Sequence, residues 1–103
     1  MDIRVLDSWK EFDTTFVLVR TSKGAFVLSK GRISYAIEGT YEHFEVQPCR
    51  VSQEYAGIYW RADNDLKSEA ESFECIARDL SRIGTLTGVD PFELVRIVEE
   101  KEK

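Results

Sequence analysis

Residues 14–39 read "TTFVLVRTSKGAFVLSKGRISYAIEG", and this stretch decides the fold of the 103-residue chain. Residues 14–21 are rich in β-branched and aromatic side chains and place apolar groups on both faces, which predicts a central strand covered on both sides. Gly24 is expected to form a tight turn, because glycine adopts positive φ without steric cost, and Gly31 is expected to mark the next turn. Residues 32–39 alternate apolar and polar side chains, which predicts a strand with one buried face.

Three further strands are expected on either side of this stretch, at residues 2–6, 41–46 and 55–62. Pro48 is expected to interrupt the chain after 41–46, because proline cannot donate a hydrogen bond within a central ladder. Turns as short as these join neighbouring antiparallel strands. Residues 2–62 are therefore predicted to form a meander of five or six strands.

After Asp63 the spacing of the apolar residues changes from two to between three and four. The stripe consists of Leu66, Ala70, Phe73, Ala77 and Leu80, widened by Ile76 and Ile83. This spacing predicts an amphipathic helix over residues 64–83. Gly84 is expected to end it.

A second helix is predicted over residues 91–101. Asp90 is the expected N-cap, Pro91 the first helical residue, and Glu93 stands three residues after the cap, as in a capping box. The chain is therefore predicted to be one α+β domain, residues 1–103, in which two C-terminal helices pack on one face of an antiparallel sheet.

The composition is that of a folded globular protein, with 43% hydrophobic and 32% charged residues. No apolar run reaches the roughly 18 residues that a membrane span needs, so no membrane association is expected. The first residues, "MDIRVLDSWK", contain acids and no apolar core, so they do not resemble a signal peptide. Two cysteines do not make a disulfide framework, and a reducing, cytoplasmic location is expected.

The net charge of −5 is unevenly distributed along the chain. Residues 1–62 carry as many basic as acidic groups, whereas residues 63–103 carry the whole excess of acid. Residues 14–37 contain four basic residues and no acid. The sequence thus indicates a mildly positive and a clearly negative region.

His43, the only histidine, lies six residues from Cys49. Within one strand this spacing separates them by about 20 Å, at roughly 3.3 Å per residue, so they cannot form a nucleophilic pair. An exposed histidine on a solvated strand face is expected instead. A small enzyme in which His43 or several carboxylates gather in a pocket is retained as an alternative.

No metal or cofactor is expected. Asp63, Asp65 and Glu74 fall at positions 1, 3 and 12 of a calcium loop, but Lys67 occupies position 5, and Ser68 stands where the loop requires glycine. Phosphate-binding, dinucleotide-binding and nucleophile-elbow motifs are absent from the sequence. The chain is therefore expected not to be an enzyme.

Nucleic-acid binding is a weaker alternative. Residues 76–98 resemble a helix-turn-helix, but the second helix carries Glu93, Glu99 and Glu100, which have the wrong charge for DNA. A single-stranded nucleic acid could instead lie on the sheet face beside the acid-free segment. The residues named for that role are Arg20, Lys23, Lys30 and Arg32.

The favoured hypothesis is a non-catalytic domain that binds another protein, one with a basic surface. Aromatic residues in "YAGIYWR" (55–61) would anchor the partner, and the acidic helices would steer it. The residues named for this role are Tyr55, Tyr59, Trp60, Arg61, Glu71 and Glu74. Self-association into a homo-oligomer is a special case of the same hypothesis.

A small acidic α+β domain without a catalytic motif resembles, in size and general character, phage-encoded inhibitors, anti-CRISPR proteins and toxin-neutralising immunity proteins. This resemblance implies that the domain inhibits its partner by occluding it.

Overall fold

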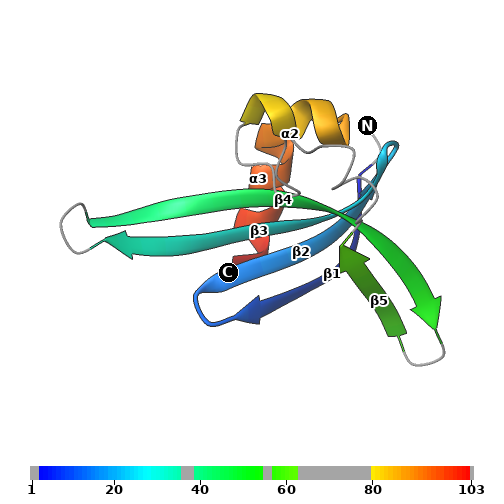
Figure 1. The fold of residues 1–103 in the computed structure, drawn as a ribbon, viewed down its shortest axis with the longest axis horizontal. Helices are drawn as coiled ribbons and strands as arrows, with labels where there is room; N and C mark the ends of the chain where they lie inside the picture. Colours follow the sequence, from blue (N-terminus) through cyan, green and yellow to red (C-terminus); the bar gives the residue numbers. More distant parts are fainter. Residues whose placement is uncertain (1–2, 36–38, 55–56, 63–79, 103) are drawn as a thin grey trace.

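The computed structural model describes residues 3–35, 39–54, 57–62 and 80–102 (Figure 1). The elements, in chain order, are β1 (Arg4–Glu11), β2 (Thr14–Thr21), β3 (Gly24–Tyr35), β4 (Gly39–Glu54), β5 (Gly57–Ala62), α2 (Leu80–Thr87) and α3 (Pro91–Glu102). The strands form one antiparallel sheet in the order β1-β2-β3-β4-β5. The prediction of an α+β fold, with an antiparallel sheet followed by C-terminal helices, is confirmed.

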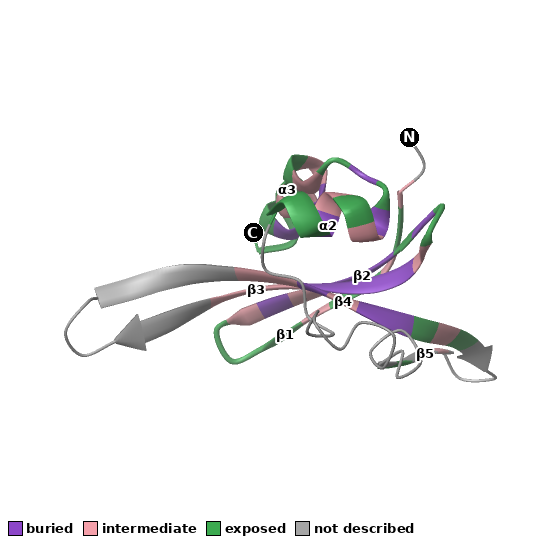
Figure 2. Ribbon diagram, turned by 45° about the horizontal axis from the view of Figure 1, so that its top comes forward, coloured by how far each residue is buried: buried purple, intermediate pink, exposed green. Residues whose placement is uncertain are grey.

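Both helices lie on one face of the sheet (Figures 1 and 2). Alternate residues of β2, β3 and β4 point toward the helices and are buried there, among them Val17, Leu28 and Val46. Leu94 and Val98 of α3 pack against them and are completely buried. One side of α3 is thus buried in the main core, which also includes Ile83 of α2.

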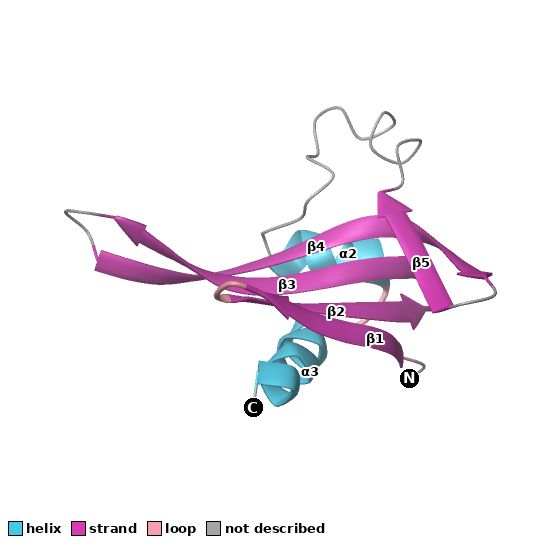
Figure 3. Cartoon of the chain, turned by 90° about the horizontal axis from the view of Figure 1, so that it is seen from below, coloured by secondary structure: helices cyan, strands magenta, loops and turns pink. Residues whose placement is uncertain are grey.

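The opposite face of the sheet carries a second, smaller core. Leu18 and Val27 are buried there, and Val51 of β4 and Ile58 of β5 pack against this cluster. Figure 3 shows why these distant strands meet, because β5 lies obliquely across the face that the helices leave uncovered. Residues 14–21 are thus buried on both faces, as the sequence predicts for β2.

Gly31 does not form the predicted turn. β3 continues through it, and Gly31 pairs with His43 of β4. A Cβ atom at position 31 would lie 2.7 Å from Oγ1 of Thr14 on the neighbouring strand. A larger residue at position 31 would therefore require the Thr14 side chain to move.

Pro48 does not interrupt its strand either. β4 runs from residue 39 to residue 54, and Pro48 pairs with Phe26 of β3. The ladder between β4 and β5 begins only at Cys49. Pro48 thus lies just outside that ladder, a position where its missing N–H costs no hydrogen bond to β5.

One other predicted strand differs in extent. β1 begins and ends later than the predicted 2–6 strand and contains a register shift between Val5 and Asp7. A β-bulge of this kind suits an edge strand, because it disturbs the regular backbone pattern to which another chain could pair. β5 is described from Gly57 to Ala62, and the first two residues of the predicted 55–62 strand lie outside the described residues.

Gly84 does not end the first predicted helix. Most of the predicted 64–83 segment lies outside the described residues, but α2 continues through Gly84 to Thr87. Gly88 ends it with a φ of 71° and donates its N–H to the carbonyl of Gly84 at 2.9 Å. Gly88 is therefore the left-handed residue that terminates the helix.

The predicted start of the last helix is confirmed. α3 begins at Pro91, and the N–H of Phe92 donates to Oδ1 of Asp90 at 3.0 Å. Glu93 pairs with Arg96, one turn further along the helix, so its carboxylate is directed along the helix. Asp90 is the N-cap that the sequence indicates.

A buried hydroxyl network joins the turn between the helices to the sheet. Oγ1 of Thr21 donates to the carbonyl of Thr87 at 2.8 Å, and Oγ1 of Thr87 donates to the carbonyl of Ile83 at 2.7 Å. The N–H of Val89 in turn donates to Oγ1 of Thr87 at 3.3 Å. These bonds satisfy groups that would be costly to bury without partners, and they set where α2 docks on β2.

Candidate functional site

The most unusual described feature is the turn between β1 and β2. Glu11 pairs with Thr14, so only Phe12 and Asp13 connect the two strands. Phe12 has a φ of 54° and is the one non-glycine residue with positive φ in the described ranges. Its side chain is fully exposed, with a relative accessibility of 106%. We call Glu11, Phe12 and Asp13 the tip.

Bulky side chains rarely adopt the left-handed region, because the Cβ atom comes too close to the following carbonyl oxygen. Two-residue hairpin turns normally place asparagine or glycine at such positions. Phe12 therefore carries a backbone cost and also leaves an aromatic ring in water.

The base of the tip is held by the C-terminal end of α3. Nζ of Lys10 donates to the main-chain carbonyl oxygen of Glu102 at 2.8 Å. Nζ of Lys30 lies 3.2 Å from a carboxylate oxygen of Glu102 and 3.6 Å from one of Glu99. Two cations at a helix C-terminus stabilise its exposed carbonyls and its negative dipole end. The hairpin that carries Phe12 is thus fastened to the helical layer.

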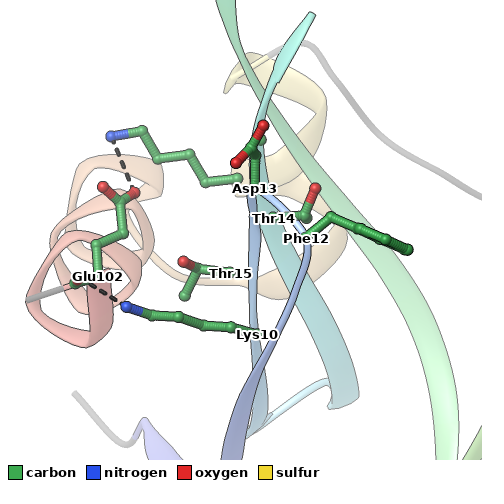
Figure 4. Close-up of a pocket in the computed structure, with 8 residues that line it drawn as sticks. Lys10, Phe12, Asp13, Thr14, Thr15 and Glu102 are labelled. Carbon is green, nitrogen blue, oxygen red and sulfur yellow. Dashed lines mark hydrogen bonds and ion pairs between the residues drawn. The ribbon is translucent and has the colours of Figure 1, made fainter.

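A pocket of about 310 Å³ lies beside the tip (Figure 4). It opens where β1, β2, β3 and the end of α3 meet. Its lining consists of Lys10, Phe12, Asp13, Thr14, Thr15, Lys30, Gly31 and Glu102. In Figure 4 the side chain of Lys10 points toward the main chain of Glu102, and the ring of Phe12 extends away from both residues. The site therefore combines a projecting ring with a polar hollow.

The cations of this site form hydrogen bonds or ion pairs, whereas two of its acids form none within the described part of the chain. Both lysines of the pocket interact with the end of α3, as described above. Glu11 and Asp13 are exposed, and within the described part of the chain neither carboxylate has a hydrogen bond or an ion pair. The tip is therefore an apolar group flanked by two accessible negative charges.

The structure places Arg20 and Lys30, two of the basic residues named for nucleic-acid binding, on opposite faces of the sheet. Arg20 is exposed on the sheet face opposite the helices, next to the second core. Lys30 lies on the helical face, and only 12% of its side chain is exposed. Nζ of Lys23 donates to the carbonyl of Thr85 at 3.1 Å. The side chain of Arg32 lies outside the described part.

The residues named for partner binding are only partly described. Tyr55, Glu71 and Glu74 lie outside the described residues. The register places Tyr59 opposite Ser52 and Trp60 opposite Val51, and the side chains of Tyr59 and Trp60 lie outside the described part of the structure. Arg61 is exposed on β5 and pairs with Arg50. This set remains a prediction.

His43 and Cys49 lie on the same continuous strand, β4. Cys49 is buried with Leu18 and Val27 in the second core, so it serves as a small apolar core residue. Among the described residues, no group of three or more His, Cys, Asp or Glu side chains is arranged to hold a metal ion. Residues 63–74, whose spacing was compared with a calcium loop, lie outside the described residues.

Phe12 is not among the residues predicted from the sequence to form a site. A usable signal was present, because "RVLDSWKE" precedes and "TTFVLVRT" follows a two-residue gap, and such a gap between strands predicts a hairpin. Phe-Asp in that gap is not a favourable pair for this turn. A poor turn residue at a hairpin tip is the clue that would have drawn attention to this position.

Comparison of the chain with protein-family models, with curated protein sequences and with solved structures found no significant match. Within the described ranges, no helix has the length and apolar character needed to cross a membrane.

Proposed function

We propose that this protein is a non-catalytic, protein-binding domain and that Phe12 is its principal anchor. One observation carries the proposal: a fully exposed aromatic ring stands on a left-handed backbone at a fastened hairpin tip. Strained residues cluster at functional sites, where the surrounding structure holds them in place.

The energetics favour binding over folding as the reason for Phe12. The left-handed conformation of a non-glycine residue costs on the order of 1–2 kcal/mol. The ring recovers nothing by burial in the domain, although burying a phenylalanine contributes about 1.5–3 kcal/mol. A partner that encloses the ring would realise this free energy.

The platform beneath the tip supports the same proposal. Lys10 ties the strand that leads into the tip to α3, and Lys30 of β3 binds the same end of α3, so the backbone at the base of the tip has less freedom to lose when a partner binds. Aromatic anchors on rigid supports are the residues that dominate binding energy at protein interfaces. In this proposal the domain acts by occlusion in the cytoplasm, in the manner of an inhibitor or immunity protein.

A capture experiment tests the proposal. Immobilised wild-type protein, Phe12→Asn and Phe92→Asn are exposed to native cell extract at low salt. Phe92 is a matched control, because it is also exposed, at 69%, but lies in the first turn of α3. We expect a stoichiometric partner on the wild type and on Phe92→Asn, and loss of that partner on Phe12→Asn. Equal capture by all three proteins, or no stoichiometric partner on the wild type, would refute the anchor role.

A further inference from the structure

We infer that the pocket beside the tip receives a lysine or arginine side chain of the protein partner. This inference rests on the proposed function and adds the chemistry of the partner to it. The partner surface would carry an apolar hole for Phe12 with a cationic side chain next to it.

The size and position of the pocket fit one side chain. About 310 Å³ lies at the lower end of the range for ligand pockets, roughly 300–1,000 Å³. Phe12 and Asp13 form part of its wall, so a partner that encloses the ring must also face the opening. The pocket is therefore reached in the same encounter as the anchor.

The electrostatics of the pocket favour a cation. Lys30 is held between two carboxylates of α3, and Lys10 binds the terminal carbonyl of that helix. Asp13, which lines the pocket, is exposed and has no ion pair or hydrogen bond among the described residues. The end of α3 contributes the negative pole of its dipole. An entering guanidinium or ammonium group would meet unengaged negative charge.

An anion is the opposite candidate, because two lysines and two threonines line the same pocket. To bind there, it would have to displace Glu102 from Lys30 and the carbonyl of Glu102 from Lys10. It would also lie beside the carboxylate of Asp13, which would repel it because like charges disfavour one another at short range. The pocket as it is built therefore selects against anions.

The test uses small probes and the intact domain. Amide chemical shifts of the ¹⁵N-labelled protein are followed by NMR during titration with N-acetylarginine amide, N-acetylglutamine amide and inorganic phosphate. We expect the arginine probe alone to shift the amides of Asp13, Thr14, Thr15 and Gly31. Equal shifts with the glutamine probe, shifts with phosphate instead, or none with arginine up to its solubility limit would overturn the inference.

Two variants locate the response. Asp13→Asn should lower the affinity for the arginine probe roughly two- to fivefold, which is the range expected for the loss of one accessible ion pair. Asp7→Asn serves as a control, because Asp7 is an exposed carboxylate of β1 outside the pocket lining, and it should leave the response unchanged. An equal effect of both substitutions would contradict the assignment to the pocket.

The two proposals fail in different ways. If Phe12→Asn loses the captured partner while the arginine probe produces no shift, the anchor stands and the cationic subsite is wrong. If the arginine probe binds at the pocket but capture does not depend on Phe12, the subsite stands and the proposed anchor is wrong.

Discussion

Two phenylalanines on neighbouring hairpins lie in opposite environments. Phe26 follows the turn between β2 and β3 and is 2% exposed in the main core, whereas Phe12, in the turn before β2, is fully exposed. Phe26 occupies an ordinary strand position, but Phe12 occupies a left-handed turn position. Replacing Phe26 would therefore damage the core, whereas replacing Phe12 removes only exposed surface and strain.

We predict that Phe12→Asn raises the free energy of unfolding by about 1 kcal/mol, because asparagine tolerates the left-handed conformation better than phenylalanine does. Urea unfolding of both proteins, followed by circular dichroism, measures the difference. If the free energy of unfolding instead fell by more than about 1 kcal/mol, the ring would stabilise the domain itself, which would contradict its proposed role as an anchor.

Some individual residues could be predicted because their roles depend on adjacent sequence alone. Asp90 and Pro91 begin α3 as expected, since a cap needs only its own side chain and the next few amides. The reason for Gly31 was not predictable, because it depends on Thr14 of another strand. Phe12 escaped notice because its strain appears only once the turn is known to contain two residues.

At the scale of elements, the end of α2 provides a paired test of two glycines. Gly88 has a φ of 71°, and the aliphatic stem of Lys23 lies 3.2 Å from the position that a Cβ atom would take. Gly84 lies within the helix, where an added Cβ would make ordinary contact with Pro91 at 3.4 Å.

We predict that Gly88→Ala destabilises the protein by at least about 1 kcal/mol, since alanine is strained at positive φ. Gly84→Ala should be neutral or stabilising by up to about 1 kcal/mol, because alanine favours the helical conformation. Thermal and urea unfolding measure both changes. The reverse order of the two effects would mean that the helix ends at Gly84 after all.

The contact that Lys30 of β3 makes with the end of α3 is the second element-level feature with a measurable consequence. Lys30→Gln should lower the free energy of unfolding by about 1 kcal/mol, because it removes a cation from the end of a helix and from two carboxylates. Lys101→Gln is the control, since Lys101 is exposed in the same helical turn.

Salt distinguishes this contact from simple packing. In 1 M NaCl the screening length falls to about 3 Å, so the difference between Lys30→Gln and the wild type should shrink. Urea unfolding at low and high salt measures this difference. If this difference in unfolding free energy did not change with salt, Lys30 would stabilise the protein through packing of its aliphatic stem and not through its charge.

The type of each described element was more predictable than its length. The β-branched and aromatic content of residues 14–21 correctly indicated a strand, but Gly31 and Pro48 each suggested a break that does not exist. Both residues are tolerated because of where the neighbouring strands lie or end. That information belongs to the register, which local sequence does not contain.

At the scale of the whole molecule, the apolar residues on both faces of β2 predicted that both faces of the sheet would be covered. The sequence predicted that helices cover one face, but it did not predict what covers the other. The second core depends on β5 lying across the free face, where Ile58 meets the cluster around Leu18 and Val27 (Figure 3). This curvature of the sheet could not be read from strand periodicity.

The acid-free segment also shows how linear charge and surface charge differ. Residues 14–37 hold four basic residues, yet the structure separates Arg20 and Lys30 onto opposite faces and binds Lys30 to α3. Strand alternation disperses charges that are neighbours in sequence. The segment therefore does not create a basic face for nucleic acid from these two residues.

The most direct test of the central claim is site-specific photocross-linking. A photoreactive benzoylphenylalanine is placed at position 12 in one protein and at position 92 in another, and each is irradiated in its native cell extract. We predict one discrete cross-linked adduct from position 12 and none from position 92, with the attachment site on the partner lying beside lysine or arginine. The same adducts from both positions, or none from position 12, would contradict the claim that Phe12 anchors a protein partner.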